Sequence, residues 1–220
     1  MSIIKSNFQS DPNVGLYGFA TDRYGICGIR NKKLGKALKV KFHVIPVYGT
    51  NLAGLFAAGN SRGIIVSRHL TKDEIAHMKS IAKVLVLDTS YTAIGNLVLM
   101  NDSGVIISPL LRKHRKEIND FFSLPCEISN VAGIAVVGSA AVATNNGCLV
   151  HPKIKINERK IIEEVLKVPV AIGSVSFGSP FVKSGLIANS RGAIVSDKTS
   201  GIELGYISEK EKRGAQNFVF

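Results

Sequence analysis

The pattern that decides the fold is clearest in Gly138-Ser139-Ala140-Ala141-Val142-Ala143-Thr144-Asn145-Asn146-Gly147-Cys148-Leu149-Val150-His151-Pro152. An apolar run leads into a short polar turn, and a glycine then opens a second apolar run. Related stretches occupy residues 54–67 and 95–109, and in all three copies the two marker glycines are nine residues apart. Residues 185–196 keep the turn with a shorter lead-in, and residues 15–27 hold the most degenerate copy. The chain therefore repeats one module five times.

The five modules account for the whole chain. Their turn glycines follow one another at intervals of 38 to 45 residues: Gly25, Gly63, Gly104, Gly147 and Gly192. A chain of 220 residues divided by five gives 44 residues for each copy. We find no linker or low-complexity segment, so we expect a single domain over residues 1–220.

Each module has the pattern of a hairpin followed by a helix and a third strand. Asn at the first turn position and Gly at the fourth are typical of a type I turn between two strands. The capping box Thr71-Lys72-Asp73-Glu74 predicts a helix over residues 71–82, and we expect helices over 112–122 and 157–167 in the same place. Residues 32–41 are a weaker candidate because of Gly35, and the last module has no convincing helix, since residues 208–213 are almost wholly polar. The third strands are predicted at residues 42–48, 84–88, 126–131 and 168–175.

A module this small cannot bury its own apolar face, so the five must pack on one another. An open solenoid needs polar capping modules at its ends. Here both ends are apolar, with Ile3-Ile4 at one and residues 218–220 at the other. The pattern therefore favours an α/β ring of five modules in which the N-terminal strand completes the last one.

Composition limits the function. The formal net charge of +12 favours an anionic partner such as nucleic acid or a ribonucleoprotein surface. The longest nearly apolar stretch, residues 131–143, is too short to cross a bilayer, and the start shows no signal-peptide pattern. Three cysteines without metal-site spacing argue against a disulfide scaffold and favour a cytoplasmic location.

The order and spacing of these motifs resemble the translation initiation factor six family. The resemblance rests on Gly-Asn-Xaa-Xaa-Gly-Ile-Ile-Val at residues 59–66, Asn-Asp-Xaa-Gly-Val at residues 101–105 and the run at residues 144–153. It extends from about residue 3 to residue 206. The chain lacks the long polar tail of eukaryotic members and therefore resembles the archaeal form.

The resemblance implies a pentein fold, which is a closed five-bladed αβ propeller with pseudo-fivefold symmetry. It implies a monomer that binds the large ribosomal subunit on its intersubunit face, in contact with a ribosomal protein and near the sarcin-ricin loop of the rRNA. Occupation of that face would prevent association with the small subunit. A role in ribosome biogenesis, through maturation of the large subunit, is implied for eukaryotic relatives. No catalytic residue, cofactor or metal is implied.

Equivalent modules would place their five polar turns on one side of the ring. The candidate partner-binding residues on the ribosome face are Asn60, Ser61, Arg62, Asn101, Asp102, Asn145, Asn146, Asn189 and Arg191. Amide, hydroxyl and guanidinium groups suit carbonyl, carboxylate and phosphate oxygens. Any one asparagine could instead serve its own turn. Basic clusters at residues 32–41, 112–116 and 153–160 are expected on solvated helix faces, where they attract rRNA over a distance.

Two other classes of function stay open. A pentein-type guanidino-modifying enzyme would use a cysteine nucleophile in the last module, but no cysteine follows Cys148, which we expect to be a buried structural thiol. His151 is equivalent to Ser67, Ser108 and Ser196 of other modules, so we interpret it as a residue that follows a strand. A general RNA-binding protein would need exposed aromatic residues among its basic runs, and the sequence does not show that pattern.

Overall fold

The computed structural model describes residues 2–208, and these form five three-stranded sheets. In each sheet an antiparallel hairpin is extended by a third strand that pairs in parallel with its second strand. The sheets are β2 (Gly18–Ala20), β3 (Tyr24–Cys27) and β4 (Lys41–Val44); β5 (Ala58–Asn60), β6 (Gly63–Ser67) and β7 (Lys83–Leu87); β8 (Val98–Met100), β9 (Val105–Ile107) and β10 (Cys126–Ile128); β11 (Ala141–Ala143), β12 (Cys148–Val150) and β13 (Val170–Ile172); and β14 (Leu186–Asn189), β15 (Gly192–Ser196) and β1 (Ser2–Ser6). The predicted hairpins are confirmed in all five modules, but the turn glycine predicted for the first is wrong: Gly25 lies within β3, and the fourth position of that turn is Tyr24.

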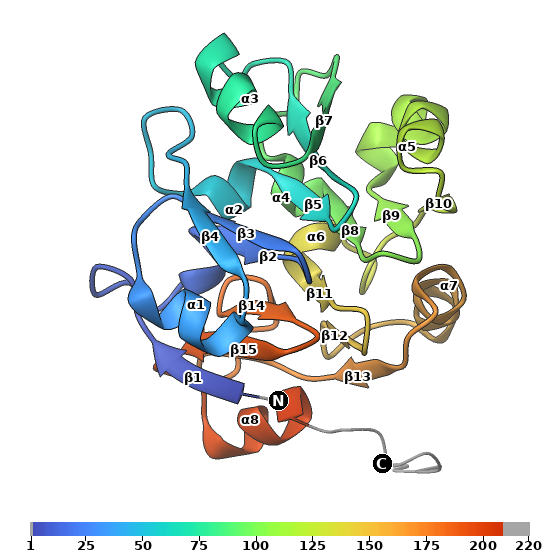
Figure 1. The fold of residues 1–220 in the computed structure, drawn as a ribbon. Helices are drawn as coiled ribbons and strands as arrows, with labels where there is room; N and C mark the ends of the chain where they lie inside the picture. The colour runs from blue at the N-terminus through green and yellow to red at the C-terminus, as the bar shows by residue number, and fades with distance from the viewer. Residues whose placement is uncertain (1, 209–220) are drawn as a thin grey trace.

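Longer helices connect the second and third strands in the first four modules, and one follows the last hairpin. They are α1 (Lys32–Leu38), α3 (Lys72–Lys79), η2 (Pro109–His114) with α5 (Arg115–Phe122), α7 (Ile156–Leu166) and α8 (Gly201–Ser208). Thr71 and Glu74 form the predicted capping box of α3. In Figure 1, α1, α3, α5, α7 and α8 lie on the outside of the sheets. Within the described residues, no helix is long and apolar enough to cross a membrane.

Two features of the helices differ from the expectation. The last module has a helix, α8, which ends at Ser208, where the polar run 208–213 begins. Residues 209–213 of that run lie outside the described residues. Helix α8 forms despite two glycines because Leu204 and Ile207 pack against the core and Glu203 accepts hydrogen bonds. The apolar runs that precede the turns were predicted as strands, but each of four runs begins with a one-turn helix. These helices are η1 (Val14–Leu16), α2 (Ala53–Phe56), α4 (Ile94–Leu97) and α6 (Val137–Ala140).

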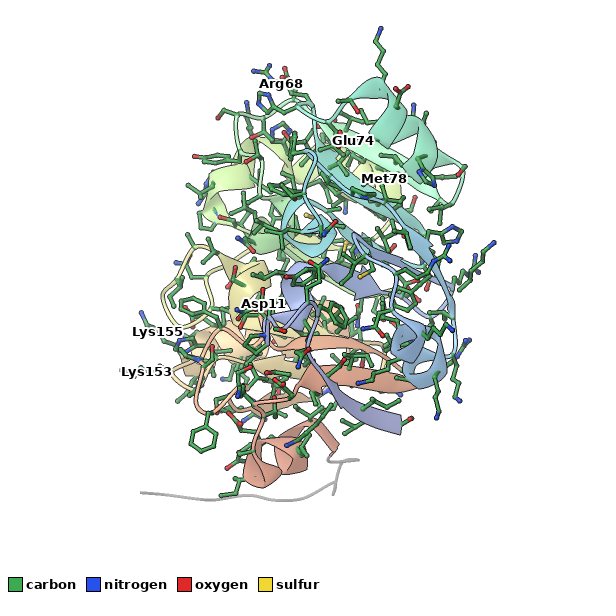
Figure 2. The ribbon with its side chains drawn as sticks, turned by 90° about the vertical axis from the view of Figure 1, so that its left-hand side faces the viewer. Asp11, Arg68, Glu74, Met78, Lys153 and Lys155 are labelled. Carbon is green, nitrogen blue, oxygen red and sulfur yellow. The ribbon has the colours of Figure 1, made fainter. Side chains whose placement is uncertain are left out.

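A glutamate at the start of three helices ties each helix to the loop that precedes its module. Glu74, which Figure 2 labels, accepts a hydrogen bond from the backbone N–H of Tyr48 at 2.7 Å. Glu158 and Glu203 hold the loops at residues 131–134 and 175–179 in the same way. Burial alone would raise the pKa of Glu203, but hydrogen bonds from Ser200, Gly178 and Ser174 lower it to about 2. The Glu203 carboxylate therefore stays charged at neutral pH, and the hydrogen bonds of all three glutamates fix the outer helices.

The N-terminal strand and the last hairpin meet in one sheet. Strand β1 pairs in parallel with β15 from Ser2 opposite Gly192 to Ser6 opposite Ser196, and Figure 1 shows the two strands side by side. The first strands of successive hairpins contact one another from β2 through β5, β8 and β11 to β14, and β14 also contacts β2. The N-terminal strand therefore completes the last module, as expected. The apolar residues 218–220 lie outside the described residues.

The hydrophobic core is divided among five clusters, and each lies between two consecutive sheets. One example joins Ile26 of β3 to Ile64 and Val66 of β6, and another joins Ile106 of β9 to Val150 of β12. The cluster that contains Cys27 and Leu34 also contains Ile194 of β15, so it joins the first sheet to the last. No sheet buries its own residues without a neighbour, which is the reason the module has to be repeated.

Close backbone packing joins the modules at the end of the hairpins opposite the turns. Gly15, Gly54, Gly95 and Gly138 occupy equivalent places, and Lys183 stands at the fifth, nine residues before Gly192. At each glycine, an added Cβ would overlap the carbonyl oxygen at the equivalent position of the neighbouring module. The overlapping pairs are Gly54 with Gly15, Gly95 with Gly54, Gly138 with Gly95, and Gly15 with Lys183. The N–H of Lys183 donates to the carbonyl oxygen of Ser139 at 3.2 Å. We call these five positions the glycine ring.

Removal of residues 1–6 tests the role of β1. Without it, the edge of β15 loses its parallel partner, and Ile3 and Ile4 no longer cover the neighbouring core clusters. We expect the free energy of unfolding to fall by about 2 kcal/mol or more, because two half-buried isoleucines and the hydrogen bonds of the parallel ladder are lost. Chemical denaturation measures the change. Lys5→Ala, in which an exposed side chain of the same strand is removed, should change stability by less than about 0.5 kcal/mol. An unchanged unfolding midpoint in the truncated chain would contradict the structure.

Candidate functional site

The five hairpin turns form one end of the molecule, which we call the turn face. They comprise residues 21–24, 60–63, 101–104, 144–147 and 189–192. In three of them the first residue is Asn60, Asn101 or Asn189, whose side-chain oxygen accepts hydrogen bonds from the N–H groups two and three residues later. Threonine takes this position in the other two turns, and its hydroxyl accepts the same pair of bonds. The three asparagines are buried and shape their own turns.

The same asparagine side chains connect each turn to the next module. The amide of Asn60 donates to the carbonyl oxygen of Asn101 at 2.9 Å. The amide of Asn101 donates to Thr144 at 3.1 Å and to Leu166, at the end of α7, at 2.8 Å. Asn189 repeats this pattern with the carbonyl oxygens of Thr21 and Leu38. The turn face is therefore held together by buried hydrogen bonds between modules.

A carboxylate and amide cluster closes the middle of the turn face. The amide of Asn145 donates to Asp22 at 2.8 Å and to Asp102 at 2.7 Å. The two carboxylates in turn accept from the backbone N–H groups of Ser190 and Ser61. A hollow of about 20 Å³ remains at this point, lined by residues from the five turns and the strands that lead into them. This cluster fixes all five turns relative to one another, and Asp22 is a member that the predicted set did not include.

The exposed tips of the turns are Arg23, Arg62, Asn146 and Arg191. Arg62 donates to the carbonyl oxygen of Phe122 at the end of α5, and Arg191 donates to that of Lys39 after α1. Each guanidinium thus neutralises a helix C-terminus while it stays accessible. Arg23 occupies the same slot as Arg62 and Arg191, but the predicted set omitted it. Alignment on Gly25 would put Tyr24 in this place, and the hydrogen bonds of the turn at residues 21–24 are what identify Arg23.

Further lysines surround these tips. Lys39 and Lys167 follow the ends of α1 and α7 in left-handed conformation, and both are exposed. Lys41 and Lys83 are exposed at the starts of β4 and β7, where they pair with Tyr24 and Gly63 of the turns. The rim of the turn face is therefore basic, whereas its middle contains two carboxylates. This combination can accept a partner that carries phosphate or carboxylate groups.

Most of the remaining basic residues lie on the outer helices, as expected of a solvated face. Lys32, Lys33 and Lys36 of α1 are exposed, and Figure 2 shows Lys153 and Lys155 at the outer edge of the molecule. Arg115 and Arg159 form ion pairs with Glu127 and Glu163. The sets at residues 112–116 and 153–160 sit near the N-terminal ends of α5 and α7, away from the turn face.

The cysteines and His151 have the environment of structural residues. Cys27, Cys126 and Cys148 are buried free thiols, and burial raises the pKa of Cys27 to about 11 and that of Cys126 to about 12. A thiol that holds its proton at neutral pH is a poor nucleophile. His151 accepts a hydrogen bond from the N–H of Lys153 at 3.0 Å. The hydroxyls of Ser67, Ser108 and Ser196 each accept the equivalent hydrogen bond, from the N–H two residues later. This confirms the prediction that His151 and these serines occupy the same position after a strand.

Comparison with known proteins identifies the family of this chain. The sequence model of the eIF-6 family matches residues 3–210. The chain belongs to the eIF-6 family. It is similar to translation initiation factor 6 of Pyrococcus abyssi, with 36% identity over 95% of this chain and 98% of the relative. The same protein of Methanococcus vannielii is 36% identical over 94% of this chain and 97% of the relative.

A cavity of about 80 Å³ lies between the sheets of this eIF-6 family member. Each first strand of a hairpin contributes to its wall, and Lys183 of the glycine ring also lines it. The Nζ of Lys183 donates to the carbonyl oxygen of Gly95 at 2.6 Å, across the end of the cavity. Burial lowers the pKa of Lys183 to about 7, although the residue as a whole keeps some solvent exposure.

Replacement of Asn101 tests the connection between turns. Asn101→Ala removes the acceptor for two turn N–H groups and the donor to two carbonyl oxygens. Because these groups are buried, we expect the free energy of unfolding to fall by about 2 to 4 kcal/mol. Asn146→Ala is the matched control, since Asn146 is exposed and its amide makes one bond to the carbonyl oxygen of Ser190. Equal losses in the two variants, measured by denaturant unfolding, would refute the structural role of Asn101.

The lowered pKa of Lys183 predicts how stability depends on pH. The unfolded chain holds the Lys183 proton up to about pH 10.4, whereas the folded chain releases it near pH 7. The unfolded state therefore binds more protons between these values, and stability should rise with pH in this window by about 1.4 kcal/mol for each pH unit, or about 4 kcal/mol between pH 7 and pH 10. Lys183→Met removes the titrating group. The difference in unfolding free energy between wild type and variant, followed from pH 6 to pH 10, isolates this contribution, and a pH-independent difference would contradict it.

Proposed function

We propose that this protein is a translation initiation factor that binds the large ribosomal subunit through its turn face. The bound factor would cover the intersubunit face of the large subunit and prevent its association with the small subunit. The observation that carries the proposal is the turn face itself, in which hydrogen bonds join the five turns into one surface with a basic rim. Membership of the eIF-6 family and relatives named translation initiation factor 6 support it.

The fold that we propose is the pentein, a closed five-bladed αβ propeller in a single domain over residues 1–220. Five three-stranded sheets support it, together with the pairing of β1 and β15 and the contact of β14 with β2. A ring of this kind needs no conformational change to bind, because buried hydrogen bonds already hold the turns in place. The protein would act as a rigid cytoplasmic monomer that works by steric obstruction, and it could also act in maturation of the large subunit.

The predicted partner-binding residues divide into two groups in this proposal. Arg62, Asn146 and Arg191, joined by Arg23, would contact the partner directly because their side chains are exposed. The others would position the turns, because their polar groups are bonded within the turn face: Asn60, Ser61, Asn101, Asp102, Asn145 and Asn189. The contacts proposed are a ribosomal protein of the intersubunit face and rRNA near the sarcin-ricin loop. Carboxylates of such a protein and rRNA phosphates both suit the arginines.

Charge reversal on the rim tests this assignment. The variant Arg23→Glu, Lys83→Glu, Lys167→Glu changes three exposed rim residues and leaves the turn hydrogen bonds in place. We expect its affinity for purified large subunits in sedimentation to fall at least tenfold, since each reversal turns an attraction to phosphate into a repulsion. Added wild-type protein should also deplete joined ribosomes while free large subunits accumulate, and the variant should not.

The matched control carries the same charge change on the outer surface. Lys33→Glu, Lys113→Glu, Lys153→Glu alters three exposed residues near the starts of the connecting helices. It should retain affinity to within about threefold, since its charges act only over a distance. An equal loss in both variants would reject the turn face as the binding surface. Strong binding of the wild type to free RNA in a gel shift would favour a general RNA-binding protein instead.

An enzymatic role in guanidino modification has less support in the site. The thiols are buried within the sheets, and burial raises their pKa values. Cys148 and His151 lie in the same module, but the nitrogen of His151 is bonded to the backbone of Lys153. We therefore propose that the protein is not an enzyme and uses no cofactor. Turnover of arginine-like substrates would overturn this part of the proposal.

A further inference from the structure

Lys183 breaks the symmetry of the glycine ring. The equivalent position in the other four modules is glycine, and in each of these the backbone packs on a carbonyl oxygen of the preceding module. A lysine at the fifth position keeps the backbone contact through its N–H and adds a long side chain. That side chain reaches past Gly138 to the carbonyl oxygen of Gly95, so it crosses the end of the central cavity.

The cavity contains one ionisable group in an apolar environment. Among the residues of the described chain that line it, Lys183 is the one that can carry a charge. The short helical segments that surround this end, η1, α2, α4 and α6, contain no ionisable side chain either. The rest of the wall consists of glycine, alanine and larger apolar residues such as Phe19, Leu99 and Ile187. A buried ammonium in such a place lacks a counter-ion in the described part of the chain.

The ammonium also has unused donors. A lysine ammonium has three N–H groups, and the carbonyl oxygen of Gly95 accepts one of them. The remaining two are available to a group inside the cavity that Lys183 lines. A carboxylate satisfies both needs at once, because it supplies a compensating negative charge and two acceptor oxygens.

We propose that the central cavity binds a short-chain aliphatic monocarboxylate, with its carboxylate on the Nζ of Lys183 and its alkyl chain against the apolar wall. One positive charge favours a monoanion over a phosphate or a dicarboxylate, whose second charge would be buried without compensation. A cavity of about 80 Å³ has room for about six water-sized atoms, which corresponds to acetate through butyrate. The site is separate from the turn face, and the proposal is independent of the ribosomal partner.

The far end of the cavity supports this orientation. Near the turn face the hollow is lined by Asp22 and Asp102, which repel an anion. The first strands of the hairpins run from the glycine ring to the turns, and the hollow and the cavity share Ala20, Gly59, Met100 and Ala143 of these strands, so the carboxylates and Lys183 lie at opposite ends of the strands. An anion is therefore attracted to the Lys183 end. Burial lowers the pKa of Lys183 to about 7, and a bound carboxylate would raise it again.

The experiment titrates the full-length protein with sodium formate, acetate, propionate and butyrate, and follows the ¹³Cε signal of Lys183 by NMR. We expect saturable binding that strengthens about fourfold with each added methylene. Binding of butyrate should be at least fivefold weaker at about pH 8.5 than at about pH 6, because the ammonium loses its proton. The apparent pKa of Lys183 should rise when butyrate is bound.

Two variants separate the ammonium from the fold. Lys183→Met keeps the length of the side chain without its charge, and Lys183→Gly restores the residue of the other four modules. In these variants the methyl signals of Leu99 and Ile187, which line the cavity, report binding. Each variant should bind butyrate at least tenfold more weakly than wild type, while Lys198→Met, which changes an exposed lysine, should bind as wild type does.

Three results would overturn the proposal. The first is a Lys183 signal that does not respond to any of the four acids, which would mean that water alone fills the cavity. The second is butyrate binding that persists in Lys183→Met. The third is an affinity that does not change with chain length and is matched by chloride, which would mean a non-specific anion contact without the apolar part of the site.

Discussion

Close contact between the backbones of successive modules is the constraint on which the rest of the structure depends. At one end, each glycine of the glycine ring lets its module pack against the carbonyl oxygen of the module before it. At the other end, buried asparagines bond their own turn and the next one. Between these ends the core is made of clusters that two sheets share. Because no cluster belongs to one module, the modules can be stable only together.

This constraint explains why the candidate binding surface is rigid. A turn that carries a polar tip is normally mobile, since few contacts hold it. Here the first residue of each turn is tied to the strand ends, and Asn145 links Asp22 to Asp102 across the middle. The arginines at the tips also bond the ends of neighbouring helices. A surface ordered in this way loses little conformational entropy on binding, which suits a protein that acts by occupying a face.

The sequence predicted the repeated unit well because the repeat itself averages over weak local signals. Turn glycines at near-constant spacing identified all five hairpins, and the capping box at Thr71 located α3. Helix α8 was not predicted, because Gly201 and Gly205 give its sequence a low helix propensity. Its stability comes from Glu203 and from tertiary packing. Local patterns also could not distinguish an asparagine that shapes a turn from one that binds a partner. That distinction depends on burial, which only the packing of two modules determines.

Residues that differ from the repeat are the best candidates for a role that belongs to one module. Residues that most modules share, such as the glycine that ends four of the five turns, serve the packing that all five need. Asn145 and Lys183 differ from this rule, since each occurs in one module and extends towards the central axis, Asn145 at the turn face and Lys183 at the glycine ring. Asn145 acts on groups of the protein itself and completes a hydrogen-bonded cluster. Lys183 places an amine in an apolar cavity where the described chain offers it one carbonyl oxygen, and the carboxylate proposed above would supply the compensation that the ammonium lacks.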